Sequence, residues 1–216
     1  MSIFKVFLVT TALVASIPAS QTAFAEGPIS ANVALTSNYI FRGVTQNNED
    51  PALQGGFDYE HKSGFYTGVW GSNVDFGGDE STEIDIYGGW GFDVGGGVSL
   101  DFGVILYRFF GGDAASNSDI EEAYAGVSLY GFDLYYYSGL DDATDNVELS
   151  YGFDLTEGLG LGFTIGDYED VSDEYYSVSL SGTGPVSLWG VDWDITIADA
   201  DATDDVQGAL TISKSF

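Results

Sequence analysis

The sequence contains no cysteine, so neither a disulfide nor a thiolate metal ligand can hold the fold together. Basic residues are also few. Five lysines and arginines stand against 34 aspartates and glutamates, which gives a formal net charge of −29. A protein that binds nucleic acid needs clustered cations to neutralise the phosphates. The charge balance therefore excludes nucleic acid as a partner.

Long apolar runs and helical patterns are missing as well. After residue 25, no stretch reaches 18 consecutive apolar residues, which excludes a membrane-spanning helix. No G-x-G-x-x-G motif precedes a helical pattern, so a nucleotide-binding fold is not supported. Yet 44% of the residues are hydrophobic and 15% are aromatic, which is too apolar for a disordered acidic tail. We expect a folded chain.

The residue types that catalysis requires are scarce. His61 is the single histidine, and no G-x-S-x-G motif supplies a serine nucleophile. Carboxylates are so abundant that pairs arise by chance and carry no information about acid-base chemistry. We therefore predict that the protein is not an enzyme, and we assign no catalytic, cofactor-binding or metal residue. The acidic stretches 141–148 and 199–205 lack the spacing of a calcium-binding loop and support only weak bridging by divalent cations.

The first 25 residues have the pattern of a secretory signal peptide. Lys5 precedes an apolar run at residues 6–17, and Ala23 and Ala25 provide small residues two apart at the cleavage point. The apolar run is too short to cross a bilayer as a helix. We expect residues 1–25 to be removed and residues 26–216 to form a single exported domain.

A period of two runs through the rest of the chain. In residues 206–216, apolar Leu210, Ile212 and Phe216 share one parity, while small polar residues fill the other. An open sheet of this length would leave unpaired edges, so the last strand should pair with the first, residues 31–42. A change of parity near Trp189 predicts a β-bulge there.

About twelve such strands alternate with short turns and longer acidic loops, as in the outer-membrane barrels of bacteria. The predicted strands are residues 31–42, 52–61, 65–75, 83–93, 98–109, 120–129, 132–138, 146–155, 159–168, 174–181, 186–198 and 206–216.

Alternation alone leaves open whether the apolar parity faces a lipid bilayer or the core of a secreted soluble barrel. The signal peptide, the alternation of long and short connections, and aromatic residues near strand ends on the apolar parity favour the membrane. We therefore predict an all-β fold, a membrane-spanning up-and-down antiparallel β-barrel with short periplasmic turns and longer acidic extracellular loops. The aromatic residues are Tyr39, Phe41, Phe57, Tyr59, Trp90, Phe92, Phe132, Phe153 and Phe216.

Three stretches near the start carry a family resemblance. They read V-A-L-T-S-N-Y-I-F-R-G-V-T-Q at 33–46, P-A-L-Q-G-G-F-D-Y at 51–59 and S-G-F-Y-T-G-V-W-G-S-N-V-D-F at 63–76. This part of the chain resembles the TorF-type porins, and the remainder resembles them in pattern only. The resemblance implies a Gram-negative outer-membrane barrel with a channel role, and it transfers no functional residue. The terminal Phe216 is similar to the signal read by the barrel-assembly machinery, which we expect as a partner.

The function we expect is that of a porin for passive diffusion of small hydrophilic solutes, with a preference for cations because carboxylates outnumber Arg42 on the polar parity. Its other expected partner is outer-membrane lipid. The alternative is a non-conducting structural or surface-display barrel. The predicted pore-lining residues are Arg42, Asp58, Glu60, Asp85, Tyr87, Asp101, Tyr107, Tyr124, Tyr135, Tyr137, Glu148 and Asp154.

Overall fold

The computed structural model describes residues 28–112, 119–140, 143–168 and 173–216. The expected signal peptide lies outside these residues. No helix in the described part of the chain is long and apolar enough to cross a membrane.

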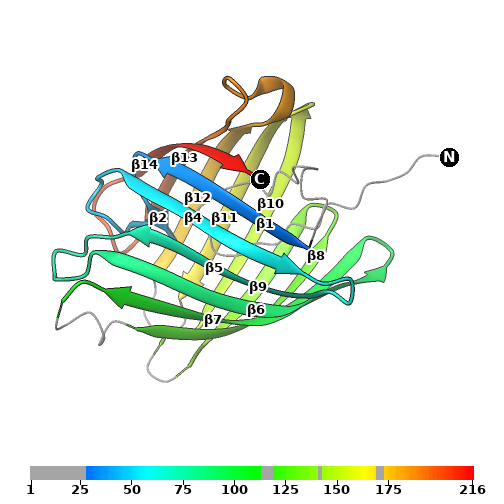
Figure 1. Cartoon of the computed structure of the whole chain (residues 1–216), viewed down its shortest axis with the longest axis horizontal. Helices are drawn as coiled ribbons and strands as arrows, with labels where there is room; N and C mark the ends of the chain where they lie inside the picture. The colour runs from blue at the N-terminus through cyan, green and yellow to red at the C-terminus, as the bar shows by residue number, and fades with distance from the viewer. Residues whose placement is uncertain (1–27, 113–118, 141–142, 169–172) are drawn as a thin grey trace.

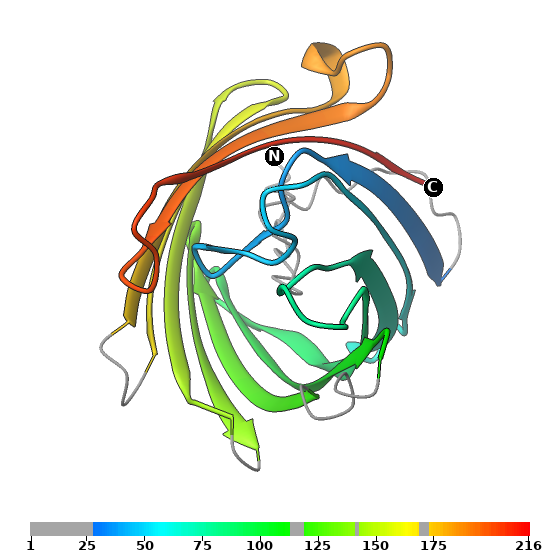
Figure 2. The same ribbon diagram turned by 90° about the vertical axis from the view of Figure 1, so that its left-hand side faces the viewer.

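The described residues form a closed antiparallel barrel of twelve strands, which confirms the predicted fold class (Figures 1 and 2). Each strand pairs with its neighbours in the chain, apart from the small β2–β3 hairpin, and the strand numbering includes that hairpin. The barrel strands are β1 (Ile29–Thr36), β4 (Ala52–Glu60), β5 (Phe65–Asn73), β6 (Thr82–Gly95), β7 (Val98–Phe110), β8 (Ile120–Leu129), β9 (Phe132–Leu140), β10 (Asn146–Thr156), β11 (Leu159–Tyr168), β12 (Asp173–Gly182), β13 (Asp192–Ala200) and β14 (Gln207–Ser215).

The barrel closes where the last strand meets the first. Leu35 of β1 lies opposite Ile212 of β14, and on its other side opposite Leu53 of β4. Beyond the end of β14, the Phe216 amide donates to the Ala31 carbonyl at 2.9 Å, and the Ala31 amide donates to the Phe216 carbonyl at 3.2 Å. Closure pairs the backbone groups that an open sheet would leave exposed at its edges.

Connections of different length lie at the two ends of the barrel. One end, here the short-turn end, has connections of two to four residues at 61–64, 96–97, 130–131 and 157–158. The other, the long-loop end, includes the connections 37–51, 74–81 and 201–206. The turn at Tyr130 and Gly131 shows how the chain reverses in two residues: both have positive φ, 51° and 87°, as a tight hairpin turn requires. The exception at the short-turn end is the connection 183–191.

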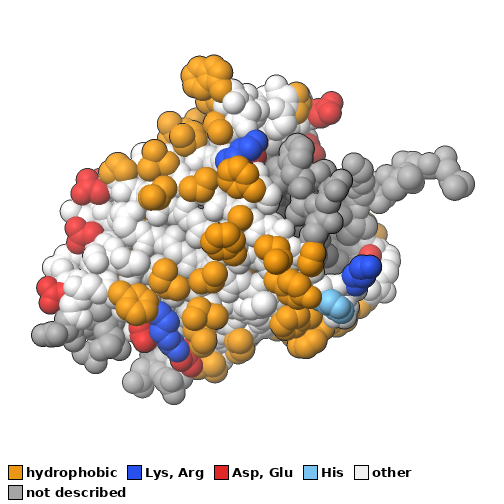
Figure 3. All heavy atoms as spheres, viewed as in Figure 1, with side chains coloured by type: hydrophobic (Ala, Val, Ile, Leu, Met, Phe, Trp, Pro, Cys, Tyr) orange, Lys and Arg blue, Asp and Glu red, His pale blue; other side chains and the backbone are white. Residues whose placement is uncertain are grey.

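The apolar parity faces outward. Leu149 and Val147 on β10 are exposed, whereas Asn146 on the opposite parity is fully buried inside the barrel. On β5, where the sequence leaves the facing ambiguous, Tyr66 and Trp70 point inward. Figure 3 shows hydrophobic side chains spread over the outer wall formed by β1, β4, β5, β6 and β7. The outer wall is therefore apolar and the inner wall is polar and aromatic.

The predicted strand 31–42 is wrong in its second half. β1 ends at Thr36, and residues 37–51, here called the inserted segment, fold inside the ring of strands (Figure 2). Tyr39 is consequently 1% exposed rather than lipid-facing, and Phe41 packs inward against the same cluster. The strand ends because the Thr36 hydroxyl bonds the Asn38 carbonyl at 2.8 Å and turns the chain inward.

The predicted β-bulge near Trp189 is also wrong. Leu188 and Val191 exchange two backbone hydrogen bonds of 2.9 and 3.1 Å, which close a two-residue turn, and β13 begins only at Asp192. Trp189 and Gly190 at its tip have φ of 52° and 82°. A turn reverses the chain, whereas a bulge only adds one residue to a strand. Both change the parity of the apolar residues, so the sequence pattern does not distinguish a turn from a bulge.

The facing of β10 can be tested with a matched pair of substitutions. Leu149→Arg places a charge on the outer wall and should lower the free energy of unfolding by about 2–4 kcal/mol if that position lies near the middle of a bilayer. Ser150→Arg, on the inner wall, should cost much less. Urea unfolding of the refolded barrel in lipid vesicles measures both. Equal costs would show that the assigned facing is wrong.

Candidate functional site

The predicted pore-lining residues all occupy inward positions, eleven on barrel strands and Arg42 on the inserted segment. They differ in depth. Asp85, Tyr107, Tyr135 and Tyr137 are buried, whereas Glu60 and Asp154 are exposed near the short-turn end. The other inward positions, at Asp58, Tyr87, Asp101, Tyr124 and Glu148, are partly exposed. That these side chains line a conducting path stays a prediction.

Arg42 lies at the tip of the inserted segment and is fixed from several sides. It occupies the turn between β2 (Ile40–Phe41) and β3 (Val44–Thr45), with a positive φ of 47°. Its guanidinium donates to both carboxylate oxygens of Glu122 on β8, at 2.8 and 3.0 Å, and to the Tyr168 hydroxyl at 3.2 Å. The ring of Tyr137 lies 4.7 Å from the guanidinium carbon. Such a planar, two-point pair is the strongest form of ion pair that arginine makes.

The environment keeps Arg42 charged although it is buried. Burial lowers the pKa of the guanidinium, but the attraction of Glu122, Tyr168 and Tyr107 raises it by more, so the net shift is upward. The Tyr107 hydroxyl also donates to Glu122 at 2.9 Å. Other protein groups therefore hydrogen-bond to both members of the pair, which a buried ion pair needs in order to be stable.

Polar side chains hold the rest of the inserted segment. The Tyr39 amide donates to Asn47 Oδ1 at 2.9 Å, and the Thr45 hydroxyl donates to Asn38 Oδ1 at 2.7 Å. Asn38 also reaches the opposite side of the closure seam, where its amide donates to Gln207 Oε1 at 3.1 Å. These contacts define one conformation for a segment that would otherwise be a long loop.

Aromatic packing fills the lumen on the long-loop side. Tyr39 meets Trp70 edge to face with ring centroids 5.5 Å apart. Ile105, Tyr107 and Phe109 of β7 complete a buried cluster against them. The inserted segment therefore narrows the barrel to a constriction at this level.

Two carboxyl groups in the constriction have no ion-pair partner among the described residues. Glu83 and Asp85 lie two residues apart on the inner face of β6, and Asp85 is only 1% exposed. In the same part of the chain, both oxygens of Asp85 and Oε2 of Glu83 have no hydrogen-bond partner. Arg42 is already engaged by Glu122, so it supplies no counter-charge to either group.

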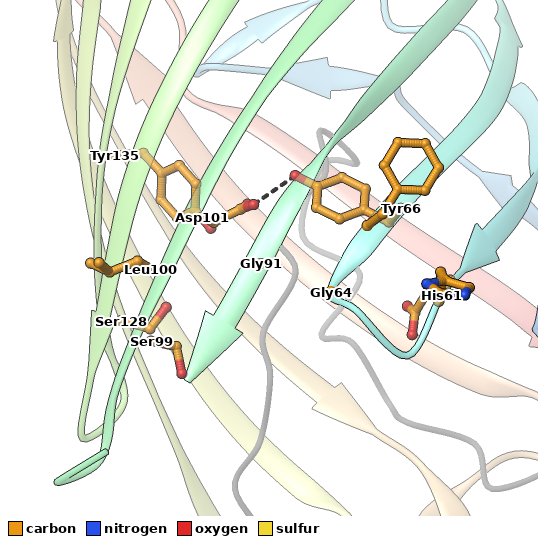
Figure 4. A pocket seen from close by; sticks show the side chains of 11 residues that line it. His61, Gly64, Tyr66, Gly91, Ser99, Leu100, Asp101, Ser128 and Tyr135 are labelled. Carbon is orange, nitrogen blue, oxygen red and sulfur yellow. Dashed lines mark hydrogen bonds between the residues drawn. The ribbon is translucent and has the colours of Figure 1, made fainter. Parts of the chain in front are cut away.

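On the short-turn side, the lumen opens into a cavity of about 70 Å³ lined by both acidic and aromatic residues. There the Tyr66 hydroxyl donates to Asp101 at 2.7 Å (Figure 4), and the Tyr135 hydroxyl donates to the other oxygen of Asp101 at 3.1 Å. Ser99 and Ser128 add hydroxyl groups to the lining. This cavity offers oxygen atoms and ring faces, and neither lysine nor arginine is among its lining residues.

Tyrosine hydroxyls bond carboxylates elsewhere on the inner wall too. Tyr175 donates to Glu148 at 2.8 Å, and Tyr87 donates to Asp58. The inner tyrosines therefore do more than fill space: they orient carboxylates against the wall.

The sequence prediction missed Glu122 and Asp133. Both point inward, two residues before the predicted Tyr124 and Tyr135 on the same strands. The strand period alone contained this signal, since residues two apart share a face.

The acidic loops show no preformed metal site among the described residues, where no three His, Cys, Asp or Glu side chains gather closely enough to hold an ion. Asp145 instead accepts hydrogen bonds from Tyr136 and from the Gly139 amide, which lower the pKa of its carboxyl group. Residues 141–142 lie outside the described ranges. Weak bridging by divalent cations stays a prediction.

A closed twelve-strand barrel with an apolar exterior and a polar interior has the fold of the outer-membrane porins. The solved structure entitled "KdgM porin" is similar over 87% of this chain and 98% of that one, with a TM-score of 0.62. The "KdgM porin in complex with disordered oligogalacturonate" matches over 87% and 97%, with a TM-score of 0.60. Both are 9% identical in sequence to this chain, so the likeness shows the fold alone.

The family is established by sequence. The family described as "Bacterial protein of unknown function (Gcw_chp)" matches residues 20–142, more than half of the chain. This chain belongs to that family. No protein of curated function matches it in sequence. The first strands resemble the TorF-type porins in sequence, but the description of this family does not use that name.

The ion pair inside the barrel gives a stability prediction. Glu122→Gln leaves the Arg42 charge buried without its counter-charge and should lower the free energy of unfolding by about 3–5 kcal/mol. Glu121→Gln is the matched control: Glu121 is the next residue, faces outward and pairs with the half-exposed Arg108, so its loss should cost about 1 kcal/mol or less. Urea titration followed by tryptophan fluorescence measures both. Similar values would mean that the inner pair does not hold the inserted segment.

Proposed function

We propose that this protein is an outer-membrane porin through which small hydrophilic solutes diffuse passively, with a preference for cations. The observation that carries the proposal is the contrast between the two walls. The outer wall exposes apolar side chains on every strand, and the inner wall carries carboxylates and tyrosines. A water-soluble barrel would need polar side chains outside and apolar side chains inside, because a continuous apolar exterior of this extent is unfavourable in water.

The outer membrane is the location that fits best. Closed barrels with an even number of antiparallel strands, short turns at one end and longer loops at the other are typical of that membrane. The expected signal peptide agrees with export. The terminal Phe216, paired with Ala31 at the closure seam, is the feature we propose that the barrel-assembly machinery reads.

The preference for cations follows from the acidic groups of the inner wall. Arg42 is neutralised by Glu122, while carboxyl groups occupy the exposed or partly exposed inward positions 58, 60, 101, 148 and 154. A ring of acidic groups attracts cations and repels anions. For the same reason we do not extend the oligogalacturonate of the KdgM complex to this chain, since an acidic ligand would meet carboxylates here.

Single-channel recording in planar bilayers tests this proposal. The purified protein should give small conductance steps, and a potassium chloride gradient should give a reversal potential of the sign expected for cation preference. Replacing both Glu60→Gln and Asp154→Asn should move that potential towards zero, because it removes two exposed carboxylates from the inner wall. Glu121→Gln, on the outer wall, should leave it unchanged. Absence of steps at any salt concentration would refute the channel, and anion preference would refute the charge argument.

The packed lumen favours a second candidate, a non-conducting barrel with a structural or surface-display role. Tyr39, Trp70 and Phe109 form an aromatic cluster of the kind found in a protein core, and a core does not conduct.

Liposome swelling separates the two candidates. Proteoliposomes placed in an iso-osmotic solution of a small sugar should swell if the constriction leaves a path, because the sugar enters and water follows. Vesicles loaded with a dextran too large to permeate control for leakage. No swelling with any sugar, together with no conductance, would favour the non-conducting barrel.

A further inference from the structure

The connection 183–191 differs from the other connections at the short-turn end, which span two to four residues. Here called the tryptophan projection, it joins β12 to β13 through the short helix η2 (Gly184–Val186) and the Leu188–Val191 turn. It stands away from the barrel wall at the top of Figures 1 and 2.

The projection has a defined conformation. The Trp193 indole donates to the Val186 carbonyl at 2.9 Å, and the Lys214 ammonium donates to the Gly190 carbonyl at 2.8 Å. The turn itself is closed by two hydrogen bonds between Leu188 and Val191. These bonds hold the projection against β13 and β14 from two sides.

The position of Trp189 at the tip of the projection is energetically unfavourable. The side chain is 99% exposed, and the backbone adopts a positive φ of 52°, a conformation that bulky residues rarely take. Asparagine or glycine would fit such a turn without strain. A large apolar side chain in a strained, exposed position is a sign of function rather than of packing.

The composition of the projection is equally unusual for this chain. Residues 183–191 read T-G-P-V-S-L-W-G-V and contain no charged residue, although the chain has 34 acidic residues. The connections 37–51, 74–81 and 201–206 at the opposite end all contain Asp or Glu. The projection also continues the apolar outer face of its own strands, where Val178, Ile195 and Ile197 are exposed. Hydrophobic side chains cover its tip in Figure 3.

We propose that the projection places Trp189 in the lipid headgroup layer on the short-turn side of the bilayer and anchors that rim of the barrel there. An indole prefers this layer because its ring is apolar and its N–H can bond to water and headgroups. The inference rests on the membrane location in the proposed function and is independent of conduction.

Depth-dependent fluorescence quenching tests the anchor in the full-length mature chain. The barrel is refolded into phosphatidylcholine–phosphatidylglycerol vesicles whose acyl chains carry bromine either near the headgroup or deep in the bilayer. The contribution of Trp189 is the difference between the wild type and Trp189→Phe, which leaves Trp193 and its bond to Val186 in place. Trp90→Phe gives the contribution of an outward tryptophan on β6 in the same way, and Trp70→Phe gives that of an inward one.

The anchor predicts that the Trp189 signal is quenched more by shallow bromine than by deep bromine, whereas the inward Trp70 is quenched little by either. If Trp90 is quenched and Trp189 is quenched by neither lipid, the barrel is inserted and the projection lies in water, which overturns the anchor but not the porin. If the Trp189 signal becomes protected only as the protein-to-lipid ratio rises, a second copy of the chain covers the projection and the anchor is again wrong. If neither tryptophan is quenched, the barrel is not in the bilayer, and both proposals fail.

A spin label supplies a second measurement that leaves Trp189 in place. Because the chain has no cysteine, Ser187→Cys provides a single attachment point beside the turn. The anchor predicts that oxygen, which concentrates in lipid, relaxes the label more than a water-soluble nickel chelate does. The reverse order would overturn it.

Discussion

Closure of the sheet is the constraint on which the rest of this structure depends. In the membrane that we propose for this barrel, a strand edge would have no water to satisfy its amides and carbonyls, so the wall would be stable only when β14 pairs with β1. Once the ring is closed, the two-residue period of every strand assigns each side chain to one of two surroundings. The apolar exterior and the acidic interior are therefore consequences of one geometry.

Inside the ring, a single arginine organises the polar groups. Arg42 bonds Glu122 at two points and stacks on tyrosine rings, and so fixes the tip of the inserted segment to strands across the lumen. With this charge neutralised, the acidic groups at the exposed or partly exposed inward positions dominate the inner wall. Structural stability and the proposed ion preference thus draw on the same few charges, so substitutions at Glu122 are expected to affect both.

Strand existence, facing and closure could be predicted from the sequence because the alternation is local and each strand repeats it. The second half of the predicted strand 31–42 could not be predicted, because Tyr39 and Phe41 continue the period of two while the chain leaves the barrel wall and enters the lumen. Only the hydrogen bond from Thr36 to the Asn38 carbonyl ends the strand, and propensity does not reveal such a bond. The Arg42–Glu122 pair could not be predicted from the sequence either, because it joins residues 80 positions apart. At Trp189, a turn and a bulge shift the parity in the same way.

The inserted segment follows the first strand of the barrel, yet several of its contacts are with the last. Asn38 bonds Gln207, and the Ser37 amide and hydroxyl bond the backbone of Leu210. These groups lie 169 to 173 positions apart in the sequence, so their contacts require the two ends of the sheet to meet. We therefore expect the inserted segment to reach its final position, and the constriction to form, only when the barrel closes.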